Sequence, residues 1–246
     1  MIINNKRILA VLAHPDDETF GMGGTLAFYA ARGVEVYLVC ATRGEAGEVD
    51  EKYLKNLSSV AEIRETELRC AATILGIKDV YFLGYRDSGM LGSQDNQHPG
   101  ALIRRSVDEV AGKIVAYIRQ IQPDVILTFD PIGGYRHPDH IYIHQATTIA
   151  FKEAGNKDFY PGTGTPYLPP AMYYHTISHA FLKVVIFIFR VLGKDPQRFG
   201  KNGDIDLQSI ADVNFPVHVK INIRSVLKKK QMATLCHVSQ GGIQMR

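Results

Sequence analysis

The sequence is poor in cysteine, and its cysteines are not arranged in pairs. Its three cysteines, Cys40, Cys70 and Cys236, lie far apart among apolar residues. An odd, widely spaced set is typical of reduced, buried thiols, whereas small secreted domains carry dense, even sets that form disulfides. We therefore expect three free thiols in the reducing environment of the cytoplasm.

An excess of one charge and a signal-like apolar start are also missing. The formal net charge is +3, and the charged residues form no long run of one sign. This balance indicates neither nucleic acid nor an acidic membrane surface as a partner. The first strand-like residues begin about six residues from the start, without the apolar region of a signal peptide before them. These absences favour a cytoplasmic protein that does not insert stably into a membrane.

The most apolar segment, residues 181–192, is too short to cross a bilayer, which takes about 20 helical residues. Its two charged residues, Lys183 and Arg190, are seven positions apart, which places them on one side of a helix but on opposite faces of a strand. We therefore predict a helix with one polar stripe. Its apolar face could pack in the core, line a substrate groove or contact another subunit, and we favour core packing or a subunit contact.

Apolar runs of strand length alternate with helical segments over the first 153 residues. Continuous apolar strands separated by helices are typical of a parallel sheet covered on both faces. We therefore predict an α/β fold with a Rossmann-like, doubly wound and mainly parallel sheet, in which ligands bind beyond the carboxyl ends of the strands. The expected strands are 8–13, 34–41, 80–83 and 125–129, and the expected helices are 25–31, 57–75, 101–122 and 141–152.

The remainder, residues 154–246, has a less regular pattern. Residues 156–170 are rich in Gly and Pro and predict a long loop. Short strands are expected at 172–175 and 217–223, followed by a helix from about residue 225. We interpret residues 1–246 as a single catalytic domain with its core at about 6–153, whose remaining residues build the walls of a pocket.

Two motifs of His and Asp follow predicted strands, one at residues 13–18 and one at residues 137–140. We expect His14, Asp17 and His140 to bind one metal ion, because two imidazoles and one carboxylate leave a fourth position for water in hydrolytic zinc sites. Zinc in such a site lowers the pKa of its bound water to about 7. Each residue alone could instead cap a helix or close a turn. Their joint occurrence at two strand ends favours the metal site.

Hydrolysis also needs groups that move protons. Asp16 stands next to a ligand and is our candidate for the base that takes a proton from the water. His137 is placed three residues before His140, where it could stabilise charge on the intermediate and protonate the leaving amine. Asp139 could fix the tautomer of His137 and raise its basicity.

Taken together, the AHPDDE and HPDH motifs resemble those of the LmbE/PIG-L family of zinc-dependent de-N-acetylases. The resemblance implies His14, Asp17 and His140 as zinc ligands, Asp16 as the general base and His137 as the acid or electrostatic partner. It implies Zn²⁺ as the cofactor and an N-acetylated amino sugar or glycoconjugate, such as an N-acetylglucosamine conjugate, as the substrate. Further residues that resemble the family are 42–45, 64–65, 87–90, 133–135 and 236–240.

Four outer residues have a functional and a structural interpretation each. Arg64 resembles a substrate-contacting arginine, or forms a salt bridge within a helix rich in Glu. Tyr135 resembles a tyrosine that moves over the substrate carbonyl, or simply packs. Asp87 could bind sugar hydroxyls or close a turn. His237 could line the pocket or end a helix. The Gly-rich residues 21–24 are a separate motif, and they lack the spacing of a nucleotide-binding loop.

Several alternatives stay open. The same catalytic groups would serve an amidase that acts on a thiol conjugate of the glucosaminyl-inositol type. A metallophosphoesterase usually needs more carboxylates, which bridge two metals, and a non-catalytic, metal-binding sugar-recognition domain would not need the complete set. Fe²⁺ could replace zinc, and a homo-oligomer is possible. Because relatives often continue past residues 239–240, the natural chain could also extend beyond Arg246.

Overall fold

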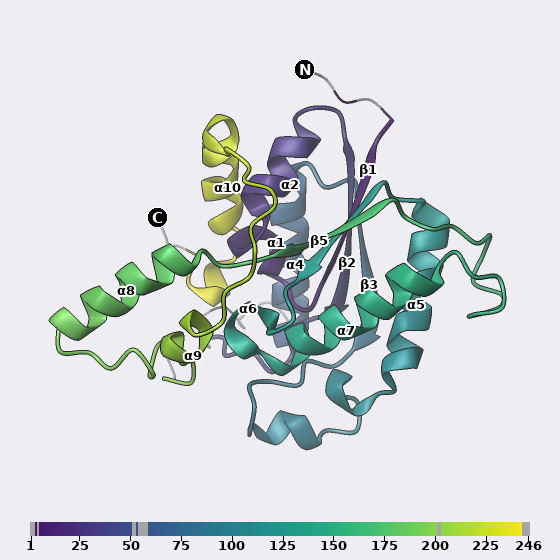
Figure 1. The fold of residues 1–246 in the computed structure, drawn as a ribbon. Coiled ribbons are helices and arrows are strands. Elements are labelled where there is room, and N and C mark those ends of the chain that lie inside the picture. The colour runs from purple at the N-terminus through teal and green to yellow at the C-terminus, as the bar shows by residue number, and fades with distance from the viewer. Residues whose placement is uncertain (1–2, 4, 51–52, 54–58, 201–202, 243–246) are drawn as a thin grey trace.

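Five parallel strands form the central sheet of the computed structural model (Figure 1), which describes residues 3, 5–50, 53, 59–200 and 203–242. The strand order is β3-β2-β1-β4-β5, and every neighbouring pair is parallel. This order confirms the predicted doubly wound α/β sheet. The strands are β1 (Arg7–Leu12), β2 (Glu35–Thr42), β3 (Asp79–Tyr85), β4 (Val125–Phe129) and β5 (Ala171–His175).

Strand β1 lies at the centre of the sheet because both of its faces are apolar. Its residues from Leu9 to Leu12 are fully buried. It pairs with β2 through Ile8 and Val36 and with β4 through Ile8 and Val125. A strand covered on both faces needs a continuous apolar run, which explains why the pattern of β1 does not alternate.

Helices cover both faces of this sheet (Figure 1). One face is covered by α2 (Gly23–Ala30), α4 (Val60–Leu75) and α10 (Leu227–Thr234), and the other by α5 (Val107–Ile121) and α7 (Pro138–Glu153). The ends of α4 follow from its sequence. The Ser59 side chain accepts a hydrogen bond from the Glu62 amide, and Gly76 ends the helix with a φ of 83°. The predicted start of this helix at residue 57 lies outside the described residues.

One predicted helix start and one predicted strand were wrong. The helix expected from residue 101 begins at Val107, because Arg86 exchanges backbone hydrogen bonds with Gly100 and Leu102 and holds that segment beside β3. Residues 217–223 alternate like a strand but pair with no strand among the described residues. The segment is extended and packs on α2, where Ile223 lies against Gly24. Alternation indicates which side chains face inward, but a strand also needs a free partner edge.

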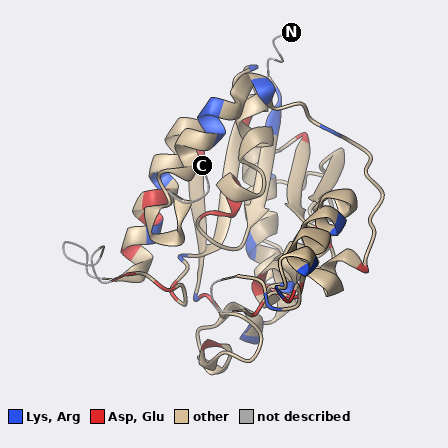
Figure 2. Cartoon of the chain, turned by 90° about the vertical axis from the view of Figure 1, so that its left-hand side faces the viewer, with Lys and Arg blue, Asp and Glu red and all other residues tan. Residues whose placement is uncertain are grey.

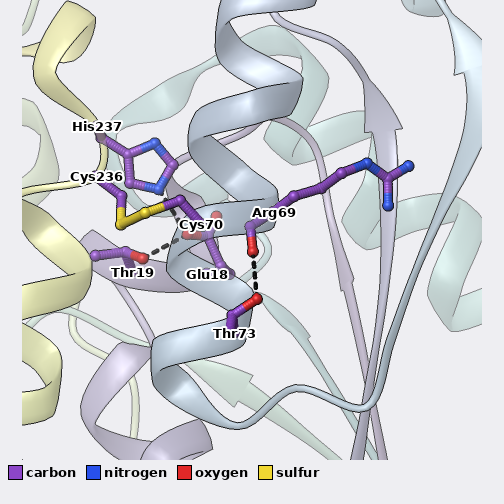
Figure 3. Close-up of a disulfide and its surroundings, with 7 residues drawn as sticks. All are labelled: Glu18, Thr19, Arg69, Cys70, Thr73, Cys236 and His237. Atoms are coloured by element: carbon purple, nitrogen blue, oxygen red, sulfur yellow. Dashed lines mark hydrogen bonds and ion pairs between the residues drawn. A yellow bond between two sulfur atoms is a disulfide. The ribbon is translucent and has the colours of Figure 1, made fainter.

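The cysteine prediction was wrong as well. Cys70 on α4 and Cys236 just after α10 form a disulfide with a Cα–Cα distance of 5.9 Å (Figure 3). Cys40 is free and buried, as expected. The two bonded cysteines are separated by 166 positions. Their pairing depends on the packing of α10 against α4, which spacing in the sequence does not reveal.

The apolar segment forms helix α8 (His179–Val191), which projects from the body of the molecule (Figure 1). Leu182 and Ile186 are buried against α9 (Leu207–Ala211), whereas Phe181 and Phe187 are exposed. The helix carries Lys and Arg but no acidic residue, as a view from its side shows (Figure 2). The predicted helix is confirmed, with only one of its faces in a core. In the described part of the chain, no helix combines the length and apolarity needed to cross a membrane.

Short elements complete the chain. They are α1 (Asp17–Phe20), α6 (Gly133–Arg136) and the 3-10 helices η1 (Gln94–Gln97), η2 (Leu102–Arg104), η3 (Arg224–Val226) and η4 (Val238–Gln240).

Candidate active site

The two His/Asp motifs meet at the carboxyl edge of the sheet, where the strand order reverses. The chain runs from β1 outward through β2 and β3, then crosses to β4 and β5 on the other side of β1. Residues 14–18 follow β1, and residues 137–140 come after β4. Such reversals are where open α/β sheets bind their ligands. The topology therefore brings together two motifs that lie far apart in the sequence.

Three predicted ligands place their donor atoms close together. His14 Nδ1 lies 3.2 Å from His140 Nε2, Asp17 Oδ1 lies 3.2 Å from His140 Nε2, and Asp17 Oδ2 lies 3.7 Å from His14 Nδ1. Ligands at zinc–ligand distances of 2.0–2.1 Å around a tetrahedral centre are roughly 3.3 Å apart. Possible ligand atoms of His14, His137 and His140 lie within 4.8 Å of one another, and so do those of His14, Asp87 and Asp139. The short distances from Asp17 to both imidazoles add its carboxylate to the first group.

The hydrogen bonds of the two imidazoles also suit a cation. His140 Nδ1 donates to the Gly133 carbonyl at 3.2 Å, and His14 Nε2 donates to Asp139 at 3.1 Å. The other nitrogen of each ring then carries a lone pair, and these two lone pairs face each other next to the Asp17 carboxylate. Three electron-pair donors that converge in a buried site repel one another unless a cation lies between them. The residues present therefore fit a divalent metal.

Asp139 lies at a different place from the one expected. Its carboxylate accepts hydrogen bonds from His14 Nε2 and from the Ser88 amide at 3.0 Å, and it is fully buried. The group that contacts His137 is the backbone amide of Asp139, which donates to His137 Nδ1 at 3.2 Å. The tautomer of His137 is thus set by the start of helix α7, with Nε2 carrying the proton, while the Asp139 carboxylate orients His14.

Asp87 supports the same imidazole. Asp87 Oδ1 lies 3.4 Å from His14 Nε2 and accepts a hydrogen bond from the Gly89 amide at 2.8 Å. The side chain is 4% exposed. Asp87 therefore closes a turn through the Gly89 amide, as one of the two interpretations expected, and the same carboxylate faces His14.

Arg64 holds Asp16 directly. Arg64 Nη2 lies 2.6 Å from the Pro15 carbonyl and 3.0 Å from Asp16 Oδ2, and Nη1 donates to the Gly44 carbonyl at 3.0 Å. The salt bridge expected within α4 is made by Arg69 with Glu65 instead. Arg64 is 4% exposed, so its guanidinium fixes the turn that carries Asp16.

His137 and Tyr135 pack against the imidazoles of the cluster. The His137 ring meets the His14 ring edge-on at 4.5 Å, and the Tyr135 ring lies 4.9 Å from that of His140. Tyr135 belongs to a segment in which Gly133, Gly134 and Arg136 all have positive φ. It packs against the cluster formed by α8 and α9, so residues beyond 154 cover this side of the site.

His237 lies behind the turn and has no exposed surface. Its Nε2 donates to Glu18 Oε1 at 2.8 Å (Figure 3). A buried residue in this place does not touch a substrate. Its partner Glu18 has no exposed surface either.

Sequence reasoning missed two further residues. Asp130 follows β4, is 2% exposed, and accepts hydrogen bonds from the Ile132 and Gly134 amides, so it shapes the loop that carries Tyr135. Phe129 stacks on the His140 ring at a centroid distance of 3.9 Å. An Asp directly after an apolar strand was a signal for the first residue, but nothing in the sequence indicated the stacking.

Burial and charge shift the pKa values of the site. Burial raises the pKa of Asp16 to about 6, although the charge of Arg64 opposes the shift. Burial would also raise the pKa of Asp17, but His140 beside it holds that pKa well below its usual range. Burial lowers the pKa of His137 well below its ordinary value. His137 is thus a neutral imidazole with an Nε2–H donor.

Comparison with known proteins identifies the family. Residues 9–151 match the family described as PIG-L, GlcNAc-PI de-N-acetylase. The chain belongs to this family. The resemblance noted in the sequence is therefore confirmed, and with it the expectation that the fold is that of a de-N-acetylase, a hydrolase.

Individual members of the PIG-L family agree with this assignment. The chain is 46% identical over 170 residues to a 1D-myo-inositol 2-acetamido-2-deoxy-alpha-D-glucopyranoside deacetylase of Thermobifida fusca, a match that covers 65% of this chain and 59% of that relative. A Rhodococcus erythropolis protein of the same name is 36% identical, with 98% of this chain and 83% of the relative covered. Among solved structures, N,N'-diacetylchitobiose deacetylase from Pyrococcus horikoshii superposes with a TM-score of 0.65 at 25% identity, covering 96% of this chain and 70% of that one.

Proposed function

We propose that this protein is a zinc-dependent de-N-acetylase that hydrolyses the N-acetyl group of an amino sugar and releases acetate and a free amine. The observation that carries the proposal is the convergence of His14, Asp17 and His140. Asp16, the residue before Asp17, is held by Arg64. The names of the relatives support it, because they describe deacetylases of 2-acetamido sugars. The chain covers about three-fifths of the Thermobifida relative, so its activity has to be measured directly.

The cluster would hold the metal through His14 Nδ1, His140 Nε2 and the Asp17 carboxylate. A bound zinc ion supplies a water of lowered pKa and polarises the acetyl carbonyl. Two nitrogens and one carboxylate favour zinc, and they also suit Fe²⁺.

The residues around the cluster divide the remaining work. Asp16, whose Oδ2 is held by Arg64, accepts the proton of the attacking water and can pass it to the leaving amine. His137 points its Nε2–H toward the developing oxyanion, because Nδ1 is occupied by the Asp139 amide. Tyr135 follows Gly133 and Gly134, which both have positive φ, and its hydroxyl would add a second donor.

On this proposal the substrate is a conjugate of N-acetylglucosamine, and the conjugate with inositol is the first one to test. The support is the shared name of the Thermobifida and Rhodococcus relatives. A thiol conjugate of glucosaminyl-inositol would need the same groups and differ only in the pocket walls. Tyr135 packs against α8 and α9, which supports a wall built from the residues beyond 154.

The test is acetate release from a panel that contains N-acetylglucosaminyl-inositol, N,N'-diacetylchitobiose and free N-acetylglucosamine. In the variant Asp16→Asn we expect kcat to fall by about 100-fold or more, because a positioned base contributes 10²–10⁴. Its metal content, measured by elemental analysis, should equal that of the wild type. The exposed Asp158→Asn is the matched control. Full activity of Asp16→Asn would remove Asp16 from its role.

Loss of a ligand should lower the metal content as well as the activity. In His140→Ala we expect metal content to fall together with activity, because one of three protein ligands is gone. A variant that keeps both its metal and its activity would show that His140 is not a ligand.

We also propose a cytoplasmic location and self-association through the exposed face of α8. The support is the balanced net charge and the exposed apolar residues of that helix. Trapping of free thiols in intact cells tests the location. In a reducing compartment the Cys70–Cys236 bond would have to resist reduction, so the redox state of these two cysteines reports on the compartment. Ultracentrifugation tests the association.

A further inference from the structure

We propose that His237 is a positioning residue, which acts through Glu18 to hold Asp16 in the conformation that directs its carboxylate to the metal cluster. The proposal rests on the function proposed above, because that function makes Asp16 the base. It gives residues 236–242, which include the buried His237, a part in the reaction.

Asp16 has a backbone conformation that needs outside support. Its φ is 117° and its ψ is −28°, which L-residues rarely adopt. Conformations of this kind are strained and persist where surrounding contacts determine them. The Asp16 amide donates to Glu18 Oε2 at 2.9 Å, and the Asp16 carbonyl accepts from the Phe20 amide at 2.8 Å. The Glu18 carboxylate is therefore the group that holds the amide side of this residue.

Glu18 is in turn fixed by His237. Glu18 Oε1 accepts a hydrogen bond from His237 Nε2 at 2.8 Å and another from the Thr19 hydroxyl (Figure 3). Both Glu18 and His237 have no exposed surface. Each oxygen of Glu18 thus has its own task, since one is held by His237 and Thr19 and the other holds Asp16. Without His237, the Thr19 hydroxyl is the donor that remains on Oε1, and the buried carboxylate can rotate away.

Helix α4 anchors this chain of contacts. The Cys70–Cys236 disulfide joins the residue before His237 to α4, and Ser239 donates to Glu67 through its amide at 2.8 Å and its hydroxyl at 2.7 Å. Residues 64, 67 and 70 are spaced by three and lie on one face of that helix. Arg64 from this face contacts the Asp16 carboxylate, so α4 supports Asp16 directly and, through the C-terminal segment, a second time.

The first experiment compares three variants of the metal-loaded protein. In His237→Ala we expect kcat to fall about tenfold or more with KM within about twofold and metal content unchanged, because only an interaction of the transition state is weakened. His237→Gln should recover most of the loss, since its amide can donate from the position of Nε2. Ser239→Ala removes only the hydroxyl bond to Glu67, while the Ser239 amide and the disulfide still anchor the segment, so its kcat should stay within about twofold of the wild type.

Three outcomes would overturn the proposal. They are an unchanged kcat in His237→Ala, an equal loss in Ser239→Ala, and a folded His237→Gln that is as impaired as His237→Ala. Should His237→Ala fail to fold, His237→Asn replaces it, because Asn is polar but too short to reach Glu18; it should then be as impaired as predicted for Ala.

A second measurement is independent of activity. Amide hydrogen exchange of Asp16, followed by NMR, should be about tenfold faster or more in His237→Ala than in the wild type, and unaffected in Ser239→Ala. An unchanged exchange rate would contradict the link from His237 to Asp16. If the wild type releases no acetate from any substrate but the exchange responds as expected, the proposed function fails and the structural link stands.

Discussion

At the scale of single residues, three neighbouring carboxylates have three different surroundings. Asp17 faces two imidazoles, Asp16 faces Arg64, and Glu18 points back to His237. On the function proposed above, the same chemical group would serve as a ligand, a base and a support. The sequence shows that the three carboxylates lie together, whereas their division of work depends on partners that lie about 50 to more than 200 positions away.

The buried carboxylate of Asp139 should control metal affinity without touching the metal. In Asp139→Asn we expect the dissociation constant of zinc to rise by about 10–100-fold, because His14 loses the charged acceptor that orients it. Competition with a chelating dye measures the constant, with the partly exposed Asp95→Asn as a control. An unchanged affinity would show that Asp87 alone suffices to orient His14.

At the scale of elements, α8 has two faces that should respond differently to truncation. Ile186 is 5% exposed and Phe187 is 67% exposed. Ile186→Ala should lower the free energy of unfolding by about 2–4 kcal/mol, whereas Phe187→Ala should change it by less than about 0.5 kcal/mol. Urea denaturation of the dilute protein measures both. A cost for Phe187 as large as for Ile186 would mean that another surface covers it.

Elements with strong local signals were predictable. Strand 125–129 and the stop at Gly76 were found as expected, because an apolar run and a glycine with positive φ act locally. The extended segment 217–223 was not, because strand formation depends on a partner edge that local alternation does not contain. The site shows the same division. The motifs predicted that His14, Asp17 and His140 lie together, and the structure brings them together. The contacts of Asp139 and His237 required the packed structure.

At the scale of the whole molecule, the disulfide should contribute to stability. It joins residues that are 166 positions apart, and closing a loop of that length restricts the unfolded chain. Replacing both Cys70 and Cys236 by Ser should lower the free energy of unfolding by about 2–5 kcal/mol. Urea denaturation with and without a reducing agent measures this. The reducing agent should destabilise the wild type but not the double variant, and equal sensitivity of both would contradict the prediction.

The same bond turns most of the chain into a closed covalent ring. Lys194 and Arg198 lie within that ring, after α8, and both are exposed. Trypsin that cuts there should therefore open the ring without dividing the molecule. The nicked protein should migrate as one species on a denaturing gel without reductant and as two fragments once reductant is added. In a protein cut in this way, the disulfide to α4 still joins the strands before the cut to the C-terminal segment after it. The active site can then stay intact although the backbone is broken.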